Sequence, residues 1–376
     1  MLVVEGLKKM SAKSPIDAFR DNLRDDVFDF FDYKRGGHLD RAAYFHPENW
    51  TDIVRASADG RGNYYLADPR REKEVLERIA ALHNSFISNG HSVTSLFEIG
   101  AGTGDKIVPF LDNPKLHSIT LIDYEVGLNE AAHDRIRKIS PDIPITLLEQ
   151  DFEAPENPPK ISGRVLGMIL GGTIANISSL PDINCMEAQE GRSGKFLRGA
   201  LTRRFHNAAR FYFNQGELLV TIDTGSKEQS LQAYQGPEHA RFIIGALETI
   251  PDLLETDLTK EKIREIFTHE PVIIEPFGRT RAICHTVVCK DGASFTIEGR
   301  RFNIKGGFRN SVINSFKPTP SQLVASARSA GFRHIDSFDD DDRLLRVVHL
   351  KYEGEKIRSS NVRSSGKYPL VATAHP

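Results

Sequence analysis

The sequence predicts an α/β fold, a doubly wound parallel sheet with an inserted α+β unit. Three observations lead to this prediction. Short apolar segments alternate with stretches of helical spacing over the first part of the chain, which is typical of a parallel sheet covered by helices. A glycine-rich loop follows the first of these segments, in "SLFEIGAGTGDK". After Thr224 the pattern changes, and a helical stretch leads into several consecutive strand-like segments.

Length and composition are those of an ordinary globular protein. The 376 residues are 39% hydrophobic and 27% charged, with a formal charge of −2 at pH 7. This balance argues against the strong basic field of a nucleic-acid-binding protein. Three cysteines without a C-x-x-C pair predict neither a disulfide framework nor a zinc site, and the longest apolar run is too short to span a membrane. We therefore expect a cytoplasmic protein with no metal ion, no nucleic-acid partner and no membrane partner.

Five segments are expected to form the parallel strands. In chain order they are "SLFEIG" (95–100), "SITLID" (118–123), "ITLLEQD" (145–151), "VLGMILGG" (165–172) and "ELLVTIDT" (217–224). The fourth is apolar throughout, which predicts burial on both faces of the sheet. The last part of the chain (319–352) reads as a helix, a strand, an acidic turn and a strand. These two closing strands suit an edge of the same sheet.

Two charged clusters are interpreted as solvated surface. Arg203, Arg204 and Arg210 lie in a stretch with helical spacing of apolar residues, and we expect the arginines on its solvated face. The four consecutive aspartates 339–342 predict a solvated turn, because adjacent carboxylates on a tight turn repel one another and do not converge on one metal ion.

The glycine loop distinguishes between classes of nucleotide-binding protein. A dinucleotide-binding loop reads G-x-G-x-x-G, but Asp105 stands where the third glycine belongs. A Walker loop requires G-K-[ST] after a four-residue spacer, and the sequence lacks it. The pattern E/D-x-G-x-G-x-G of S-adenosylmethionine (SAM) methyltransferases is matched in register by Glu98, Gly100, Gly102 and Gly104. Glycines allow the backbone to lie against the ligand. A helical pattern is expected to begin after this loop.

The next two strand ends support the same cofactor. Asp123 ends the second strand, where a carboxylate accepts both ribose hydroxyls. Asp151 and Phe152 follow the third strand, where an acid and an aromatic ring hold the adenine. Taken singly, Asp123 suits a strand-end cap and Phe152 a core position. Together with the glycine loop they lie at three successive strand ends, so the sequence predicts SAM as the cofactor.

Five stretches of the sequence resemble one family. They are "EIGAGTGDK" with Lys106, "DFE" (151–153), "LGGTIANI" with Asn176, "SLQAYQGPEHARFIIGAL" with Tyr234, and "NYYLADPRREKEVL" with Tyr64 and Tyr65. The family is that of the histidine-specific SAM-dependent methyltransferases of ergothioneine biosynthesis, which trimethylate the α-amine of L-histidine. The resemblance extends over roughly residues 40 to 355 and is most specific between 95 and 240.

The resemblance implies a class I (Rossmann-like) SAM methyltransferase fold with a substrate-binding domain. In the family this domain combines an N-terminal segment with an insertion before the closing strands. We therefore expect the cofactor-binding core in residues 76–224 and 290–353, and the substrate-binding domain in residues 20–75 and 225–289. Residues 354–376 read as a flexible tail.

The resemblance also implies roles for single residues. Asn176 and Tyr234 hold the carboxylate and amino end of the substrate, Lys106 belongs to the cofactor loop, and Tyr64 or Tyr65 lies beside the substrate. From the residues alone, Asn176 equally suits a turn or a helix cap, and Tyr234 a packing position.

One strand departs from the family pattern. The family carries I-E-M-S late in the second domain, and its Glu and Ser bind the imidazole ring. We expect the corresponding strand to be "RAICHTVV" (281–288), where Cys284 or His285 takes the place of Glu and Thr286 that of Ser. Removing the partner of a buried polar group costs about 1–3 kcal/mol, so the side-chain end of the pocket differs from one built for histidine.

These observations predict an N-methyltransferase for a histidine-like amino acid or an amine derived from an amino acid. Tyr64, Tyr65, Asn176 and Tyr234 would orient the deprotonated amine, and the tyrosine rings would stabilise the methylated ammonium. One alternative is another amine scaffold such as a prenylated tryptophan, since a relative of the family serves ergot-alkaloid assembly. Another is a SAM-binding regulatory protein without turnover. We expect a small-molecule partner and a monomer or homodimer.

Overall fold

The structure is a computed structural model that describes residues 15–32, 39–85, 93–153, 155, 157–176, 193–277 and 280–354. Apart from Gly354, the predicted tail lies outside this part of the chain. The helices are α1 (Pro15–Phe31), α2 (Asp40–Tyr44), α3 (Pro47–Ala58), α4 (Pro69–Ser85), α5 (Val126–Ile139), α7 (Ser193–Ala209), α8 (Lys227–Ala233), α9 (Pro237–Leu253), α10 (Lys260–Ile266) and α11 (Pro320–Ser329). Short 3-10 helices are η1 (Tyr65–Ala67), η3 (Val108–Phe110) and η4 (Thr173–Ala175).

The strands form three sheets. They are β1 (Ser95–Ile99), β2 (Ser118–Asp123), β3 (Ile145–Glu149), β4 (Val165–Ile169), β5 (Gly216–Asp223), β6 (Phe267–Phe277), β7 (Thr280–Cys289), β8 (Ala293–Ile297), β9 (Arg300–Ile304), β10 (Phe308–Lys317), β11 (Phe332–Asp339) and β12 (Leu345–Tyr352). The seven-stranded sheet has the order β11-β12-β5-β4-β1-β2-β3. Strands β1 to β5 pair in parallel, while β12 is antiparallel to β5 and β11 to β12. The five predicted parallel strands and the two closing edge strands are therefore confirmed.

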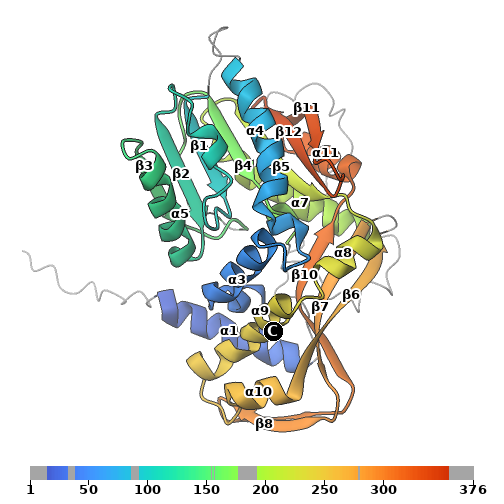
Figure 1. The fold of residues 1–376 in the computed structure, drawn as a ribbon. Helices are drawn as coiled ribbons and strands as arrows, with labels where there is room; N and C mark the ends of the chain where they lie inside the picture. The colour runs from blue at the N-terminus through green and yellow to red at the C-terminus, as the bar shows by residue number, and fades with distance from the viewer. Residues whose placement is uncertain are drawn as a thin grey trace, which may run out of the picture.

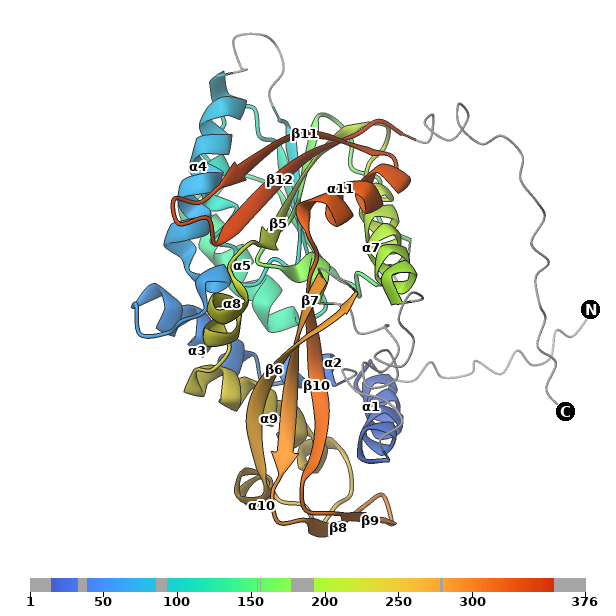
Figure 2. The same cartoon turned by 90° about the vertical axis from the view of Figure 1, so that its right-hand side faces the viewer.

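Strand alternation buries both faces of this sheet. Leu96 and Leu166 belong to the core on the side of α4 and α5, whereas Phe97 and Val165 pack with residues of α7 and α11. Figure 2 shows the sheet between α4 on one side and α7 on the other. All five residues of β4 are buried, as its apolar sequence predicts. The order in which strands are added to the sheet reverses between β1 and β4, since β2 and β3 follow on one side and β4 and β5 on the other. In such sheets ligands bind at the carboxyl ends of the strands beside this switch point.

A second sheet extends away from the first. Strands β6, β7 and β10 form it in the order β10-β7-β6, all antiparallel, and β8 and β9 form a separate hairpin. In Figure 1 these strands project below the large sheet beside α9. The predicted boundary at residue 289 is wrong for this segment, because β8, β9 and β10 (293–317) do not join the seven-stranded sheet. Strand-like patterns do not specify pairing partners, so local sequence leaves this boundary undetermined.

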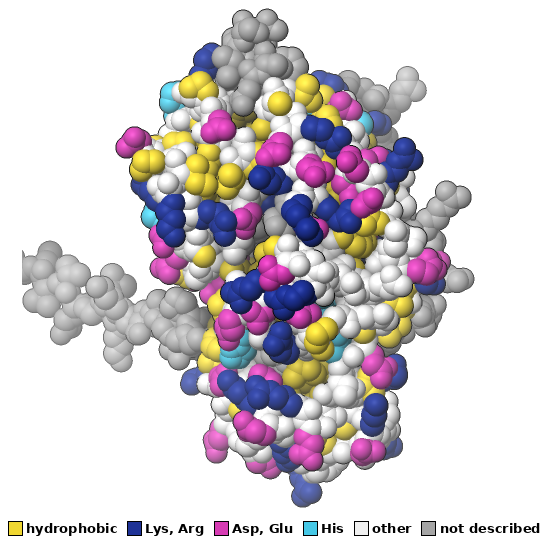
Figure 3. Space-filling view, viewed as in Figure 1, with side chains coloured by type: hydrophobic (Ala, Val, Ile, Leu, Met, Phe, Trp, Pro, Cys, Tyr) yellow, Lys and Arg dark blue, Asp and Glu magenta, His cyan; other side chains and the backbone are white. Residues whose placement is uncertain are grey.

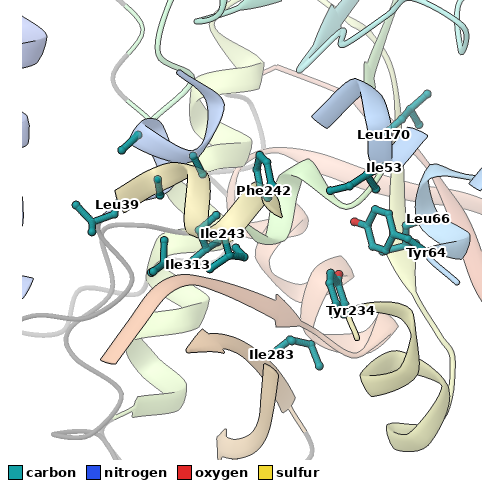
Figure 4. Packing of buried hydrophobic residues seen from close by; sticks show 14 of the residues in the cluster. Leu39, Ile53, Tyr64, Leu66, Leu170, Tyr234, Phe242, Ile243, Ile283 and Ile313 are labelled. Atoms are coloured by element: carbon teal, nitrogen blue, oxygen red, sulfur yellow. The ribbon is translucent and has the colours of Figure 1, made fainter. Parts of the chain in front are cut away.

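The N-terminal helices pack against the inserted segment. Helices α1, α2 and α3 all contact α9, and their apolar residues join one buried cluster with the second sheet. Figure 4 shows part of this cluster, from Leu39 and Phe242 to Tyr234 and Ile283. The helical stretch that the sequence predicts here is divided into α8 and α9 by Gly236 and Pro237, since proline begins a helix readily but does not continue one.

Two local predictions need correction. The stretch after the glycine loop forms turns and the single-turn helix η3 rather than a regular helix, and Pro109 lies within it, where a helix loses a backbone donor. The aspartates 339–342 do form the turn between β11 and β12, but Asp340 is buried, accepts a hydrogen bond from the Leu345 N–H (2.9 Å) and pairs with Arg71 (3.1 Å). Among the described residues, no helix has the length and apolar character needed to span a bilayer.

Candidate active site

The glycine loop after β1 packs tightly at its ends and is open in the middle. Its glycines have positive φ angles, 71° at Gly100, 54° at Gly102 and 74° at Gly104. A Cβ atom at Gly104 would lie 2.9 Å from the Cβ of Ala132 in α5. At Gly100 it would lie 2.9 Å from the side chain of Thr173. A Cβ atom at Gly102 would meet no atom within 4 Å, so the backbone there is accessible to a ligand.

Two adjoining cavities open beside this loop. Their volumes are about 300 Å³ and about 130 Å³. Both are lined by Tyr44, Trp50, Gly100, Gly102, Thr173 and Asn176. The larger cavity also contains Glu72 and Lys106, and the smaller contains Asp123, Asp151 and Phe152. Since they share one wall, the two cavities extend along the carboxyl edge of the sheet at the switch point, where the cofactor is expected.

Asp123 is tied to the glycine loop. Its carboxylate accepts hydrogen bonds from the backbone N–H of Gly102 at 3.3 Å and of Glu125 at 3.1 Å. Burial raises the pKa of Asp123 to about 6. The carboxylate lines the smaller cavity, which fits the predicted contact with two ribose hydroxyls.

Asp151 and Phe152 form the far wall of the same cavity. Asp151 accepts a hydrogen bond from the Glu153 N–H at 2.8 Å and forms an ion pair with Arg41 of α2. Phe152 is buried, and the guanidinium of Arg204 lies 5.8 Å from its ring centroid. The three residues predicted for the nucleoside end therefore line one cavity.

Glu98 is a buried carboxylate without a partner. It is fully buried, and neither carboxylate oxygen has a hydrogen-bond partner within the described residues. Burial raises the pKa of Glu98 to about 8, and the charge of nearby Lys106 opposes this shift. An unpartnered acid next to the glycine loop fits a cofactor that carries an ammonium group.

Lys106 and Glu72 connect the loop to α4. Lys106 Nζ lies 3.5 Å from the carboxylate of Glu72, which is itself buried. Glu72 accepts hydrogen bonds from the Gly171 N–H at 3.0 Å and from the Thr221 hydroxyl. Lys106 thus lines the larger cavity, as predicted for a cofactor-loop residue, and Glu72 holds the segment after β4 and strand β5 against α4.

Arg204 corrects the interpretation of the arginines as a solvated face. Arg203 and Arg210 are exposed, but Arg204 is buried. Its guanidinium donates to the carbonyl oxygens of Thr173 (2.6 Å) and Asn176 and pairs with Glu153. The helical spacing itself contains the signal for this burial, because Arg204 lies three residues after Leu201 and falls within the apolar stripe of α7.

Asn176 and Tyr234 are joined through two residues of β10. The Ser315 hydroxyl donates to Asn176 Oδ1 at 2.9 Å. Lys317 Nζ donates to Ser315 Oγ at 2.9 Å and to the Tyr234 hydroxyl at 2.6 Å. Lys317 is buried and lies 3.7 Å from the carboxylate of Asp223 at the end of β5. The sequence did not indicate Ser315 or Lys317, because no local pattern distinguishes a lysine that is buried in the fold from one that is exposed.

Tyr64 and Tyr65 serve different surroundings. The Tyr64 ring packs against Tyr234 (5.0 Å between centroids) and His239 (4.8 Å), and burial raises the pKa of Tyr64. The Tyr65 hydroxyl instead donates to Asp223 at 2.6 Å. Only Tyr64 lies directly against the predicted substrate-binding residue.

Strand alternation separates the three residues predicted on β7. The ring of His285 packs edge-on against Tyr234, with centroids 4.8 Å apart. Cys284 belongs to the opposite core cluster with Phe316, and Thr286 Oγ1 lies 3.4 Å from the Cys284 carbonyl. Adjacent strand residues face opposite sides, so the structure brings only His285 to the tyrosines.

Strand β10, rather than β7, carries the serine that reaches Asn176. Ile313 lines the smaller cavity, and Ser315, two residues later on the same face, bonds to Asn176. Thr286, predicted on β7 in place of the family's serine, instead lies 3.4 Å from the Cys284 carbonyl. Local sequence did not show which strand faces the cavity.

The three histidines near Tyr234 are stacked in one row. The rings of His239 and His285 are 6.3 Å apart and those of His269 and His285 are 5.5 Å apart, each pair nearly parallel. Burial lowers the pKa of His239 to about 3 and of His269 to about 4. Within the described residues, no group of His, Cys, Asp or Glu is arranged to hold a metal ion.

Solved structures share only a distant likeness with this chain. A SAM-dependent methyltransferase from Clostridium acetobutylicum is 10% identical, with 72% of this chain and 88% of that chain covered and a TM-score of 0.38. A sugar N-methyltransferase from Streptoalloteichus sp. is 14% identical (75% and 87% covered, TM-score 0.37). An amino pentose methyltransferase from Micromonospora echinaspora is 12% identical (73% and 91% covered, TM-score 0.37). These values carry no argument about substrate.

The sequence profile of one family covers most of the chain. The family is described as histidine-specific methyltransferase, SAM-dependent, and the match extends over residues 50–352. No curated protein matches the chain. The matched range contains the glycine loop, the Asn176–Tyr234 network and the lining of both cavities except Asp40, Arg41 and Tyr44. The chain therefore belongs to the family of histidine-specific, SAM-dependent methyltransferases, and its cofactor is SAM.

Proposed function

We propose that this methyltransferase methylates the amine of an amino acid, or of a small molecule derived from one. The observation that carries the proposal is the connection between Asn176 and Tyr234. Asn176 lines both cavities, and Ser315 and Lys317 link it to Tyr234, against which Tyr64 packs. A polar cluster thus adjoins the cofactor cavities on the side of the inserted segment.

Each residue of this cluster suits one part of an amino acid. The Asn176 amide and the Tyr234 hydroxyl provide hydrogen bonds for the carboxylate and amino end. The rings of Tyr64 and Tyr234 offer π faces that stabilise an alkylated ammonium. SAM supplies the activated methyl group. The chain contributes orientation and exclusion of water, and a buried site also favours the neutral amine, which is the nucleophilic form.

The burial of the cluster supports a small-molecule acceptor. Tyr64 is 6% exposed, Tyr234 3% and His285 4%, so a polymer has no access to them without rearrangement. On the face shown in Figure 3, basic and acidic side chains are intermingled rather than gathered into a single-sign surface. We therefore propose an amino acid or a similar small amine rather than a nucleic acid or a protein.

A panel assay tests this function. The protein is incubated with methyl-labelled SAM and a set of amino acids and amines, including histidine and tryptophan derivatives, and methylated products are identified by mass. We expect N-methylation of at least one amino acid. Tyr234→Phe and Asn176→Ala should lower kcat/KM about 10- to 100-fold with little change in SAM affinity. SAM binding without transfer to any acceptor would instead favour the regulatory alternative.

A second candidate substrate is an amino acid with a large apolar side chain, such as a prenylated tryptophan. Ile313 favours it, because this apolar side chain lines the smaller cavity on the strand that carries Ser315. Ile313→Glu should raise the kcat/KM for histidine relative to tryptophan derivatives by about tenfold, since a carboxylate there supplies a partner for imidazole. Equal effects on both classes would contradict this candidate.

A further inference from the structure

We propose that Lys317 is a positioning residue that turns both Tyr234 and Asn176 into hydrogen-bond donors toward the substrate, so that the site selects acceptors bearing a carboxylate. This inference rests on the proposed function and names the group by which the acceptor is recognised. Lys317 acts through its two hydrogen-bonded neighbours, Ser315 and Tyr234.

Lys317 is held as a charged donor. It is the last residue of β10, is 4% exposed, and lies 3.7 Å from the carboxylate of Asp223. Asp223 in turn accepts hydrogen bonds from the Tyr65 hydroxyl at 2.6 Å and the Gly225 N–H at 2.9 Å. Buried charges require such pairing. An ammonium has three donors and no acceptor, so every neutral oxygen that it contacts must accept.

The contact of Lys317 with Ser315 sets the orientation of the Asn176 amide. Ser315 Oγ accepts a hydrogen bond from Lys317 at 2.9 Å, and its hydroxyl donates one to Asn176 Oδ1, also at 2.9 Å. The oxygen of the amide is therefore turned toward β10. The Nδ2 group, which has two protons and can only donate, is left for a ligand, and Asn176 lines both cavities.

The other contact of Lys317 is with Tyr234. Its hydroxyl oxygen accepts from Lys317 at 2.6 Å, and the ammonium also lies 4.9 Å from the centroid of the ring. The Tyr234 oxygen accepts from Lys317 and also from the Tyr64 hydroxyl, so the Tyr234 hydroxyl donates only on its remaining side. A hydrogen bond from a cation also polarises the phenol and strengthens it as a donor.

Asn176 and Tyr234 therefore both present hydrogen-bond donors to the ligand. A site with two donors and a nearby buried cation matches an anionic group with several acceptor lone pairs, as in a carboxylate. An amine without a carboxylate would leave these donors unsatisfied in a buried site, which is costly. The geometry accordingly selects intact amino acids over the corresponding decarboxylated amines.

The test compares acid and amine pairs in wild type and variants. The substrates are L-histidine with histamine and L-tryptophan with tryptamine, each assayed for kcat and KM with SAM in excess. Lys317→Met removes the ammonium at similar volume. A second variant combines it with Asp223→Asn, so that no buried carboxylate is left without its partner. Lys305→Met, at an exposed site after β9, is the matched control. SAM binding measured by calorimetry shows whether each variant is folded.

We expect wild type and Lys305→Met to prefer the amino acid of the better pair by about 100-fold or more in kcat/KM. In both Lys317 variants the KM for the amino acid should rise about 10- to 100-fold, with the amine little affected and the SAM dissociation constant within about threefold. The inference is overturned if the variants weaken acid and amine equally, or if wild type methylates both equally well. No methylation of any amino acid by wild type would overturn the proposed function as well, which distinguishes the two failures.

Discussion

Glu98 is a single buried acid that makes the stability of the protein depend on pH. Its carboxylate is fully buried without a hydrogen-bond partner, and its pKa of about 8 lies above the ordinary value of 4.5. The folded protein therefore binds more protons at Glu98 than the unfolded chain does. The contribution of Glu98 to stability is present below about pH 4.5 and is lost as the pH rises toward 8.

Glu98→Gln should change the free energy of unfolding of the ligand-free protein differently at the two pH values. The change should be about 2 kcal/mol more stabilising at pH 8 than at pH 5, because glutamine carries no charge to bury. At pH 8 SAM affinity should fall about tenfold, since Glu98 can ionise there beside the ammonium of the cofactor, whereas glutamine cannot. Denaturant unfolding at both pH values and calorimetry measure these effects. Glu149→Gln, at an exposed residue ending β3, is the control. An unchanged SAM affinity in Glu98→Gln would contradict the assignment.

Arg204 provides a second prediction for a single residue. Arg204→Met removes a buried guanidinium that donates to two backbone carbonyls of the η4 segment and pairs with Glu153. We expect a loss of about 3 kcal/mol in the free energy of unfolding, because breaking a buried charge network is strongly destabilising. Arg203→Met, its exposed neighbour on the same helix, should change stability by less than about 0.5 kcal/mol. Urea unfolding at pH 7 decides, and equal losses would refute the structural role of Arg204.

The glycine loop acts as an element whose positions differ in role. Gly104→Ala places a Cβ 2.9 Å from Ala132 at a φ of 74°, so we expect loss of stability of about 2–3 kcal/mol from overpacking and strain. Gly102→Ala meets no atom within 4 Å and should cost about 1 kcal/mol of stability, but SAM affinity should fall at least tenfold. Thermal unfolding and calorimetry on both variants separate the effects. The reverse ranking would contradict this division of roles.

Individual elements were predictable to different degrees. The five parallel strands follow from apolar runs bounded by turns, because burial on both faces leaves a strong local pattern. The helix expected after the glycine loop does not form, since Pro109 interrupts it. On β7, the sequence leaves Cys284 and His285 as alternatives for one pocket position, and strand geometry places only His285 against Tyr234. The strand that does face Asn176 is β10, and only the pairing of distant strands shows this.

At the scale of the whole molecule, the buried histidines link stability to pH. His239 is 4% exposed, and its pKa of about 3 lies below the ordinary value of 6.5, with burial as the main cause. The unfolded chain therefore binds more protons than the folded protein at this residue between about pH 6.5 and 3. The contribution of His239 to stability therefore falls as the pH is lowered through this window.

We compare the free energy of unfolding at pH 7 and pH 4.5. The decrease between these pH values should be about 2 kcal/mol smaller in His239→Phe than in wild type. The buried acids contribute equally to both proteins, so the difference isolates the histidine. His334→Phe, at an exposed position on β11, should follow the wild-type curve. Guanidinium unfolding at the two pH values provides the measurement. Parallel losses in His239→Phe and wild type would show that His239 does not resist protonation.

The sequence by itself determined the parallel sheet, the SAM loop and the residues at three strand ends, because each depends on a local pattern of a few neighbouring residues. Only the tertiary structure decided that β10 faces the cofactor cavities and that Lys317 and Ser315 connect Tyr234 to Asn176. The physical reason is the sequence separation: Ser315 and Asn176 are 139 residues apart, and no local pattern encodes which distant side chains a folded chain brings together.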